Sequence, residues 1–269
     1  MSKWLQYLSL ILGSLFILLP PYIIIVTAFK TEGDFSRSPA YSLPDSFTLD
    51  NFQKVLEKGQ FLMAFSNIGY IIVASLIGNV LLGTMVSYAL GRFQFRLKGA
   101  VLGAYALSMI IPGITTQVAT FNVVKSLHLM NSHYAMIVLN LGVDVVQILI
   151  YMQFIRSIPY DIDESAFMEG ASLFKIYYAV ILPLLKPAIA TIVILKSIAI
   201  YNDMFTPFLY MPSQKLSVVT TELMRFSGRY GNSYTMLCAA ILIVAIPTVV
   251  MYLFLQKYIF KGVVNGAVK

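Results

Sequence analysis

Polar and ionisable residues lie inside long apolar stretches of this sequence, and their types indicate binding rather than covalent chemistry. Asn140, Asp144 and Gln147 follow at i, i+4 and i+7, so they would share one face of a continuous helix. Lys196 lies in another apolar stretch. A charge inside a membrane costs at least about 2.5 kcal/mol, so such groups either line a pathway or pair with each other or a neighbouring subunit. Both interpretations remain open for Asp144 and Lys196.

Other hydrogen-bonding residues extend the candidate pathway. Tyr201, Asn202 and Asp203 are adjacent, and three neighbouring polar groups at membrane depth need a cavity or several partners. The Pro112-Gly113 step interrupts a further apolar stretch, and broken helices in membranes face protein or a water-filled cavity. Single polar residues more often hold helices together. The expected pathway residues are Asn67, Tyr70, Gln117, Asn140, Asp144, Gln147, Tyr201, Asn202 and Asp203.

The segment 160–187 is a charged, glycine-containing insert between apolar stretches. Pro159 favours the first turn of a helix, and the acidic residues that follow offset the helix dipole. Gly170 can supply the left-handed residue that ends this helix, and Ser172 can cap a second one. Pro183 is expected to set the next boundary. The segment therefore predicts a helix, a turn and a helix, which together suit a docking surface.

The composition indicates an integral membrane protein. Of 269 residues, 58% are hydrophobic and 12% are charged, which leaves too little polar surface for a soluble domain. A helix needs about 20 apolar residues to cross the hydrocarbon. Six windows meet this length, roughly 5–29, 64–90, 100–121, 134–154, 188–210 and 236–255. We therefore predict an all-α membrane protein with six transmembrane helices.

The first window is too long for the apolar core of a secretory signal, so we expect it to be retained. Pro20 and Pro21 should break or kink it. Because such a disruption is tolerated where neighbouring helices satisfy the freed carbonyl groups, this helix should pack against protein.

The distribution of Lys and Arg places both termini in the cytoplasm. Totals on the two sides are nearly equal, but Arg92, Arg96 and Lys98 crowd one short loop while the outer charges are spread widely. The net charge of +7 mostly reflects this bias and forms no stripe for phosphates. We therefore exclude nucleic acid as a partner.

The histidines and the cysteine of this sequence indicate neither a metal site nor a disulfide. His128 and His133 are five residues apart and have no Cys or carboxylate close by, so we reject a metal site. The sole cysteine, Cys238, lies in the last window, which excludes an intramolecular disulfide.

We divide the chain into three parts. Residues 1–60 hold the first span and an outer loop, in which 48–58 should form a short amphipathic helix capped by Thr48 or Asp50. Residues 61–257 form the transmembrane core, including the cytoplasmic loop 156–187. Residues 258–269 form a cytoplasmic tail.

The charged insert carries a family signature that spans several short motifs. The matching residues are Ile158-Pro159, Glu164-Ser165-Ala166, Gly170-Ala171 and Leu182-Pro183. Further matches are YALGRFQF, IIP, YNDMFTPF and GVVNGAVK. Ser165 replaces a usual alanine, Glu169 a usual aspartate, and Tyr201 a usual tryptophan. Over nearly its whole length the chain resembles the permease subunits of bacterial carbohydrate ABC importers, of the binding-protein-dependent, MalG-like type.

The resemblance implies a type I ABC importer permease with cytoplasmic coupling helices, in the bacterial cell membrane. The partners that it implies are a second permease, two ATP-binding subunits, an extracellular solute-binding protein and a sugar of the oligosaccharide class. ATP and Mg would then be bound by the ATPase, with no cofactor and no catalytic residue on this chain. Independently, the sequence contains no GxxxxGK[ST] phosphate loop.

The resemblance also implies that the insert couples this chain to the ATPase. Glu164 would anchor the first helix by a charge-assisted contact, and Gly170 would permit the turn. Ala166, Ala171 and Phe174 would lie in the partner's socket. The expected coupling residues are Glu164, Ser165, Ala166, Glu169, Gly170, Ala171 and Phe174.

Two other classes of function are weighed against this one. A secondary transporter or channel acting alone would suit the apolar windows and Asp144, but it predicts an inverted internal repeat, and none is evident. An intramembrane enzyme would need a nucleophile and a base, and no convincing pair is present.

Overall fold

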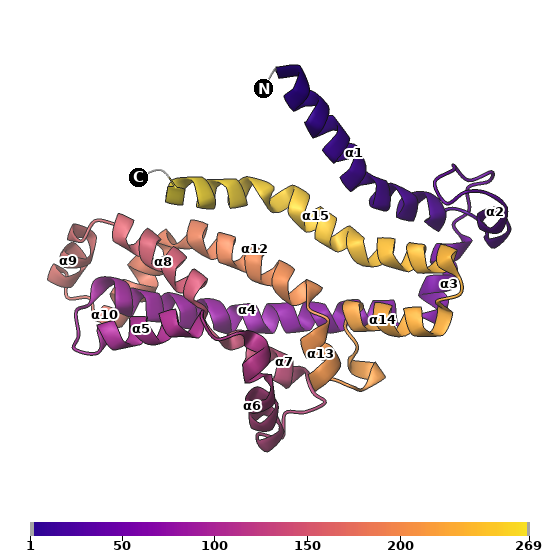
Figure 1. Ribbon diagram of the computed structural model, residues 1–269. Coiled ribbons are helices and arrows are strands. Elements are labelled where there is room, and N and C mark those ends of the chain that lie inside the picture. Colours follow the sequence, from indigo (N-terminus) through magenta and orange to yellow (C-terminus); the bar gives the residue numbers. More distant parts are fainter. Residues whose placement is uncertain (1–2, 268–269) are drawn as a thin grey trace. The chain divides into compact units, whose positions relative to one another are not determined.

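The computed structural model describes the backbone of residues 3–267 and the side chains as far as Phe254. Throughout this part the chain is helical and contains no strand, which confirms the all-α prediction (Figure 1). It divides into two compact units, one formed by Met1–Ser66 with Ser217–Met251 and the other by Asn67–Leu216 with Tyr252–Lys269. The predicted tail, 258–269, lies beyond the described side chains.

Three single helices are long and apolar enough to cross a membrane: α1 (Lys3–Ala28), α4 (Phe61–Arg92) and α15 (Tyr234–Ala267). Three bent pairs meet the same test. They are α5 (Lys98–Ser108) with α6 (Gly113–Ser126), α7 (His133–Leu141) with α8 (Val145–Ser157), and Leu173–Leu184 with α12 (Lys186–Asn202). Their bends measure 106°, 48° and 72°. The six predicted spans are reached when each bent pair counts as one crossing.

The first unit has an ordered loop after α1. The loop contains α2 (Glu32–Arg37) and α3 (Asp50–Lys58), and α14 (Val219–Tyr230) belongs to the same unit. Asn51 donates hydrogen bonds of 2.8 Å to the carbonyl groups of Ala28 and Lys30. The ammonium of the buried Lys30 donates to Ser38, Pro39 and Ser42 at 2.8 Å each. This polar network fixes the loop together with the contacts of the Phe29 ring with Phe47 and Phe52.

Helix α1 runs as one helix through Pro20 and Pro21, so of the two expected outcomes, a break or a kink, the break does not occur. Two adjacent prolines remove only two hydrogen bonds from a 26-residue helix. Only Val26, Thr27 and Ala28 of this helix are buried. The described part of its own unit therefore does not provide the expected packing for the rest of α1.

In the second unit, α8 packs closely against α4 where α4 has glycines. A Cβ atom at Gly83 would collide with the Gln147 amide, and one at Gly91 would lie 3.0 Å from Cγ2 of Ile155. Small residues at helix interfaces in membranes allow such close approach. Tyr151 of α8 is fully buried and packs with Ala188 and Ile192 of α12. Helices α4, α8 and α12 thus supply the frame for the polar residues described below.

The charged insert 160–187 forms α9 (Asp161–Met168), α10 (Leu173–Ile176), a π-helical turn (Tyr177–Ile181) and α11 (Leu182–Leu184). The expected boundary at Pro183 is a change of helix type rather than a break: the π-helical turn ends at Ile181, α11 begins at Leu182, and the backbone stays helical to Leu184. The Leu182 N–H bonds back to the Tyr177 carbonyl group, so Pro183 begins a new α-helical turn in which its missing N–H is not required. The bend comes at the following residue, Leu185.

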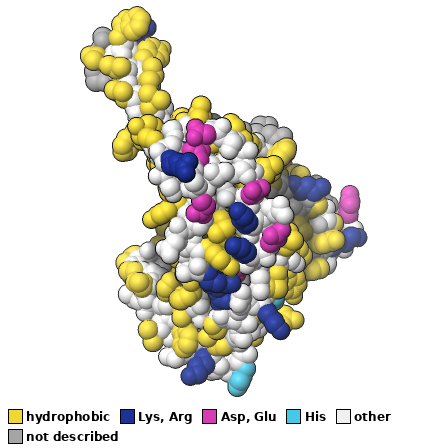
Figure 2. Space-filling model, turned by 90° about the vertical axis from the view of Figure 1, so that its right-hand side faces the viewer, with side chains coloured by type: hydrophobic (Ala, Val, Ile, Leu, Met, Phe, Trp, Pro, Cys, Tyr) yellow, Lys and Arg dark blue, Asp and Glu magenta, His cyan; other side chains and the backbone are white. Residues whose placement is uncertain are grey.

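The remaining elements of the second unit are α13 (Phe205–Tyr210) and a 3-10 turn (Gln214–Leu216). Helix α13 contacts α7, and Tyr210 packs with Val124 and Ala135. Large apolar side chains are exposed throughout the described part, and Figure 2 shows them over much of the face in view, with charged groups scattered among them. Such a surface suits lipid and protein neighbours rather than water.

Candidate functional site

The charged insert 160–187, predicted to face the cytoplasm, has the helix, turn and helix expected from its sequence. Gly170 has a φ of +82°, and the Ala171 N–H bonds back to the Ala166 carbonyl group at 3.1 Å. This left-handed residue ends α9 and redirects the chain. The Ser172 hydroxyl accepts a hydrogen bond of 3.3 Å from the Lys175 N–H and caps α10.

The predicted coupling residues divide into two faces. Glu164, Ser165, Glu169 and Gly170 are exposed, and Phe174 is 67% exposed. By contrast, the half-buried Ala166 and Ala171 pack against the chain's own apolar cluster, which consists of Tyr88, Ile155, Ile176, Tyr177, Ile181 and Leu185. The apolar side chains that face outward around the turn are Phe167, Met168, Leu173 and Phe174.

An ion pair that sequence reasoning missed holds α9 to the end of α4. The Arg92 guanidinium lies 2.7 Å from the Asp163 carboxylate, and both side chains are nearly buried. Arg92 also donates a hydrogen bond of 3.0 Å to the Ile158 carbonyl group. Its guanidinium lies over the Tyr160 ring, 5.6 Å from the ring centre. In sequence, Asp163 and Arg92 read only as a first-turn acid and a positive-inside charge. They are 71 residues apart, so only the fold reveals the pair.

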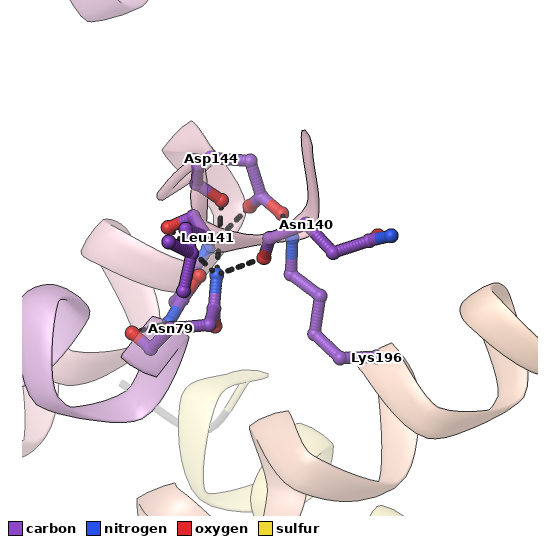
Figure 3. Close-up of polar contacts among 7 residues, drawn as sticks. Asn79, Asn140, Leu141, Asp144 and Lys196 are labelled. Carbon is purple, nitrogen blue, oxygen red and sulfur yellow. Dashed lines mark hydrogen bonds and ion pairs between the residues drawn. The ribbon is translucent and has the colours of Figure 1, made fainter. Parts of the chain in front are cut away.

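The fourth apolar window is broken between Leu141 and Val145, and a side chain from α4 fills the break (Figure 3). The Asn79 amide nitrogen lies 3.1, 3.4 and 2.9 Å from the carbonyl oxygens of Asn140, Leu141 and Gly142. Its amide oxygen accepts a 2.7 Å hydrogen bond from Gln147. Asn79 therefore satisfies carbonyl groups that the end of α7 leaves without helical partners.

Asp144 lies inside this break and has two partners. Its carboxylate accepts a 2.8 Å hydrogen bond from the Gln147 N–H, which caps α8, and lies 2.6 Å from the Lys196 ammonium of α12. Figure 3 shows the Asp144 and Lys196 side chains pointing toward each other. One of the two interpretations of these residues, an ion pair with each other, is thus present in the fold.

The expectation that Asn140, Asp144 and Gln147 share one helix face is wrong, because no single helix contains them. Asn140 belongs to α7, Asp144 precedes α8, and the axes of the two helices differ by 48°. Asp144 and Gln147 do line a common pocket of about 390 Å³ with Lys196. Its other walls are mostly apolar and come from Ser108, Met109, Val145, Val146, Ile192, Leu195 and Ala199.

The other predicted pathway residues lie elsewhere in the second unit, outside the lining of that pocket. Tyr201 is buried at the end of α12. Beside it, the Asn202 amide donates a hydrogen bond of 2.9 Å to the Ile198 carbonyl group. The Asp203 carboxylate accepts a hydrogen bond of 3.1 Å from the Thr206 N–H. The remaining contacts are from Gln117 to the Tyr210 hydroxyl at 3.4 Å, from Asn67 to the Lys215 carbonyl group at 3.0 Å, and between the rings of Tyr70 and His133 at 5.7 Å.

The interruption of the third window matches its prediction. Helix α5 ends at Ser108, α6 begins at Gly113, and Pro112 precedes the new helix. Within the described residues, no group of three or more His, Cys, Asp or Glu side chains could hold a metal ion.

Comparison with known proteins decides the family. Residues 80–264, more than half of the chain, match the family model described as the binding-protein-dependent transport system inner membrane component. The chain belongs to this family. As a member it is a non-catalytic, multi-pass membrane subunit of an ABC transporter.

Individual relatives of this ABC transporter subunit cover almost its whole length. It is 32% identical to the melibiose/raffinose/stachyose import permease protein MelC of Bacillus subtilis, over 93% of this chain and 91% of MelC. It is 29% identical to AmyC, a probable starch degradation products permease of Thermoanaerobacterium thermosulfurigenes, over 98% and 96% of the two chains. A solved bacterial alginate ABC importer has the same fold, with a TM-score of 0.85, 20% identity, and coverage of 96% of this chain and 98% of that one.

Proposed function

We propose that this subunit forms half of the pathway of an ATP-driven oligosaccharide importer. The observation that carries the proposal is the likeness to MelC and AmyC over nearly the full chain, since both are named for the import of sugars or starch products. The proposed partners are a second permease, two ATP-binding subunits, which would hold ATP and Mg, and an extracellular solute-binding protein. Both termini would lie in the cytoplasm, where the loop 156–187 meets the ATPase.

The exposed surface of the cytoplasmic loop supports docking on the ATPase. Phe167, Met168 and Phe174 are 60%, 88% and 67% exposed, and a short helix with outward apolar side chains suits a groove on a partner. The exposed carboxylates of Glu164 and Glu169 add polar contacts beside them. Movement of the ATPases would then displace this loop and rock the spans between inward-open and outward-open states.

The pocket around Asp144 supports a pathway for uncharged sugars. Sugar hydroxyl groups need amide and carboxylate partners, and their ring faces pack on apolar walls. Asp144 and Gln147 supply the polar groups, while the Lys196 ammonium balances the Asp144 charge within 2.6 Å. The other predicted pathway residues would act at further points along the route.

Reconstitution tests the proposal. The complex of both permeases and the ATPases is placed in liposomes, the binding protein is added outside, and uptake of labelled raffinose and maltotriose is followed. We expect uptake that requires internal ATP and stops with vanadate. Uptake driven by an ion gradient without ATP would instead favour a secondary transporter. A thermal-shift screen of the binding protein identifies the sugar.

A further inference from the structure

Helix α9 is held to the rest of the chain in an unusual way. Asp163 is its one buried residue, whereas Phe167 and Met168 point outward. A short helix is ordinarily held by an apolar face, because burial of side chains offsets the cost of ordering it. Here the apolar groups face away, so an ion pair and the half-buried Ala166 provide the attachment.

The partner of Asp163 is built to hold more than one group. Arg92 reaches the Asp163 carboxylate at 2.7 Å with one terminal nitrogen and the Ile158 carbonyl group at 3.0 Å with the other. Its guanidinium also covers the Tyr160 ring. One side chain at the last residue of α4 therefore contacts α9, the residue before α9 and the end of the preceding span. A planar guanidinium presents its donors in a fixed fork and can stack on an aromatic ring, and the compact ammonium of a lysine does not reproduce this geometry.

Because the pair of Arg92 and Asp163 is buried, its loss should cost more than the loss of an exposed ion pair. Exposed ion pairs contribute little, because water screens them. The Arg92 and Asp163 side chains are only 7% and 11% exposed, and removing one partner of such a pair leaves an uncompensated charge. The α4 hydroxyl of Thr84 lies 2.8 Å from the Tyr177 hydroxyl, so α4 also holds the second half of the loop.

We propose that Arg92 is a positioning residue for energy coupling, which fixes α9 to the cytoplasmic end of α4 so that a displaced loop carries α4 with it. The inference rests on the proposed docking of this loop on an ATPase. It goes beyond docking, because it assigns the transmission step to residues that face away from the partner. Loss of the pair would leave the loop docked but would free α9 from the end of α4, although Thr84 still contacts Tyr177.

The test compares Arg92→Met, Asp163→Asn and the double variant, with Arg96→Met as control because Arg96 is exposed in the same short loop. All are made in a Cys238→Ser background that carries Met168→Cys. A crosslinker from the thiol introduced at position 168 to amines on the ATPase reports docking. Liposomes report sugar imported per ATP hydrolysed. Both sugar import and ATP hydrolysis are measured per assembled complex. A loss of folded protein alone therefore does not change the amount of sugar imported per ATP.

We expect the crosslink to persist in every variant. Sugar imported per ATP should fall about tenfold for each single variant and little further for the double, because one interaction is removed in all three. Arg92→Lys, which keeps the charge but not the fork, should fall in between. The role of Arg92 would be overturned if the Arg92→Met variant imported as much sugar per ATP as the parent. It would also be overturned if the loss in the double variant were the product of the two single losses. Absence of the crosslink in the parent would instead overturn the proposed docking.

Discussion

The broken span around Asp144 and the loop after Pro159 are both held by side chains of α4, but by different chemistry. At the break, the neutral amide of Asn79 holds three backbone carbonyl groups. At the loop, the charged Arg92 holds a carboxylate and one carbonyl group. Inside an apolar stretch an amide satisfies the backbone without adding a charge that must be desolvated.

The two regions also differ in what they expose. Gln147 and Tyr151, beside the break, are buried, whereas the loop turns Phe167 and Met168 outward. We infer that the break contributes mainly to the stability of the subunit, and the loop mainly to communication with a partner. Changes at the loop should then reduce transport without unfolding the protein, whereas loss of the Asn79 contacts at the break should reduce the stability of the subunit itself.

Gly170→Asp should have the largest effect on transport. A Cβ atom at Gly170 meets nothing within 4 Å, so the cost of the side chain is backbone strain of about 1 kcal/mol. The complex should remain in the membrane at normal level, while the added charge on the docking surface abolishes uptake. Membrane content and uptake are measured together. Gly170→Asn is the matched control, because it tolerates the same φ without a charge and should retain most uptake. Normal uptake by the Gly170→Asp variant would contradict the coupling role of the turn.

Asn79→Leu should have the largest effect on stability. It leaves three carbonyl groups without their partner, while the Gln147 amide keeps only its 3.3 Å hydrogen bond to the backbone carbonyl group of residue 79. Each unsatisfied buried group costs about 1–3 kcal/mol. We expect a loss of about 3 kcal/mol or more, seen as a lower melting temperature and little assembled complex. Asn140→Leu is the control, since the Asn140 amide donates only to the Met136 carbonyl group in its own helix. Similar stability of the two variants would refute the role of Asn79.

Asp144→Asn should have an intermediate effect. An asparagine at position 144 can still cap α8, as Asp144 does. The substitution removes the negative charge that balances Lys196. Because the Asp144 side chain is half-exposed, we expect only about 1 kcal/mol of destabilisation. Uptake should fall about tenfold if the pair also lines the pathway. Reversal of both charges separates the two roles. Full recovery of uptake in the Asp144→Lys, Lys196→Asp double variant would show that the pair is only structural.

Ser172→Ala should have the smallest effect. It removes the cap of α10, which is worth about 1 kcal/mol, and the 3.3 Å hydrogen bond is long. The expected result is a small decrease in melting temperature with uptake within about twofold of normal. A loss of uptake as large as that of the Gly170→Asp variant would show that the start of α10, rather than the turn, controls coupling.

The hydropathy of the sequence predicted the six windows. Local sequence signals predicted two further features, a break inside the third window and the turn with its helix cap in the charged insert. Pro112 predicted the third-window break, and Gly170 with Ser172 predicted the turn and cap. These predictions succeed because the responsible residues lie where the feature occurs. The backbone itself requires a residue without an N–H, or one that tolerates a positive φ.

The break before Asp144 could not be predicted in the same way. A helix-face argument assumed continuity through Gly142, yet the side chain that stabilises the interruption is Asn79, more than sixty residues earlier. The same holds for Arg92 and Asp163. Each contact depends on the packing of α4 against other helices, and the sequence alone does not specify which polar residues that packing brings together.

The position of Asn79 also bears on the energy source of transport. Carbonyl groups released by a broken membrane helix can coordinate a Na⁺ ion or a proton, and secondary transporters use them to tap an ion gradient. Here a neutral amide lies where the carbonyl groups of Asn140, Leu141 and Gly142 converge, at 2.9–3.4 Å from each. The place that a driving cation would take is filled by the protein itself. At this break the carbonyl groups that a cation would need are occupied by the Asn79 side chain, as we expect of a transporter powered from outside the chain.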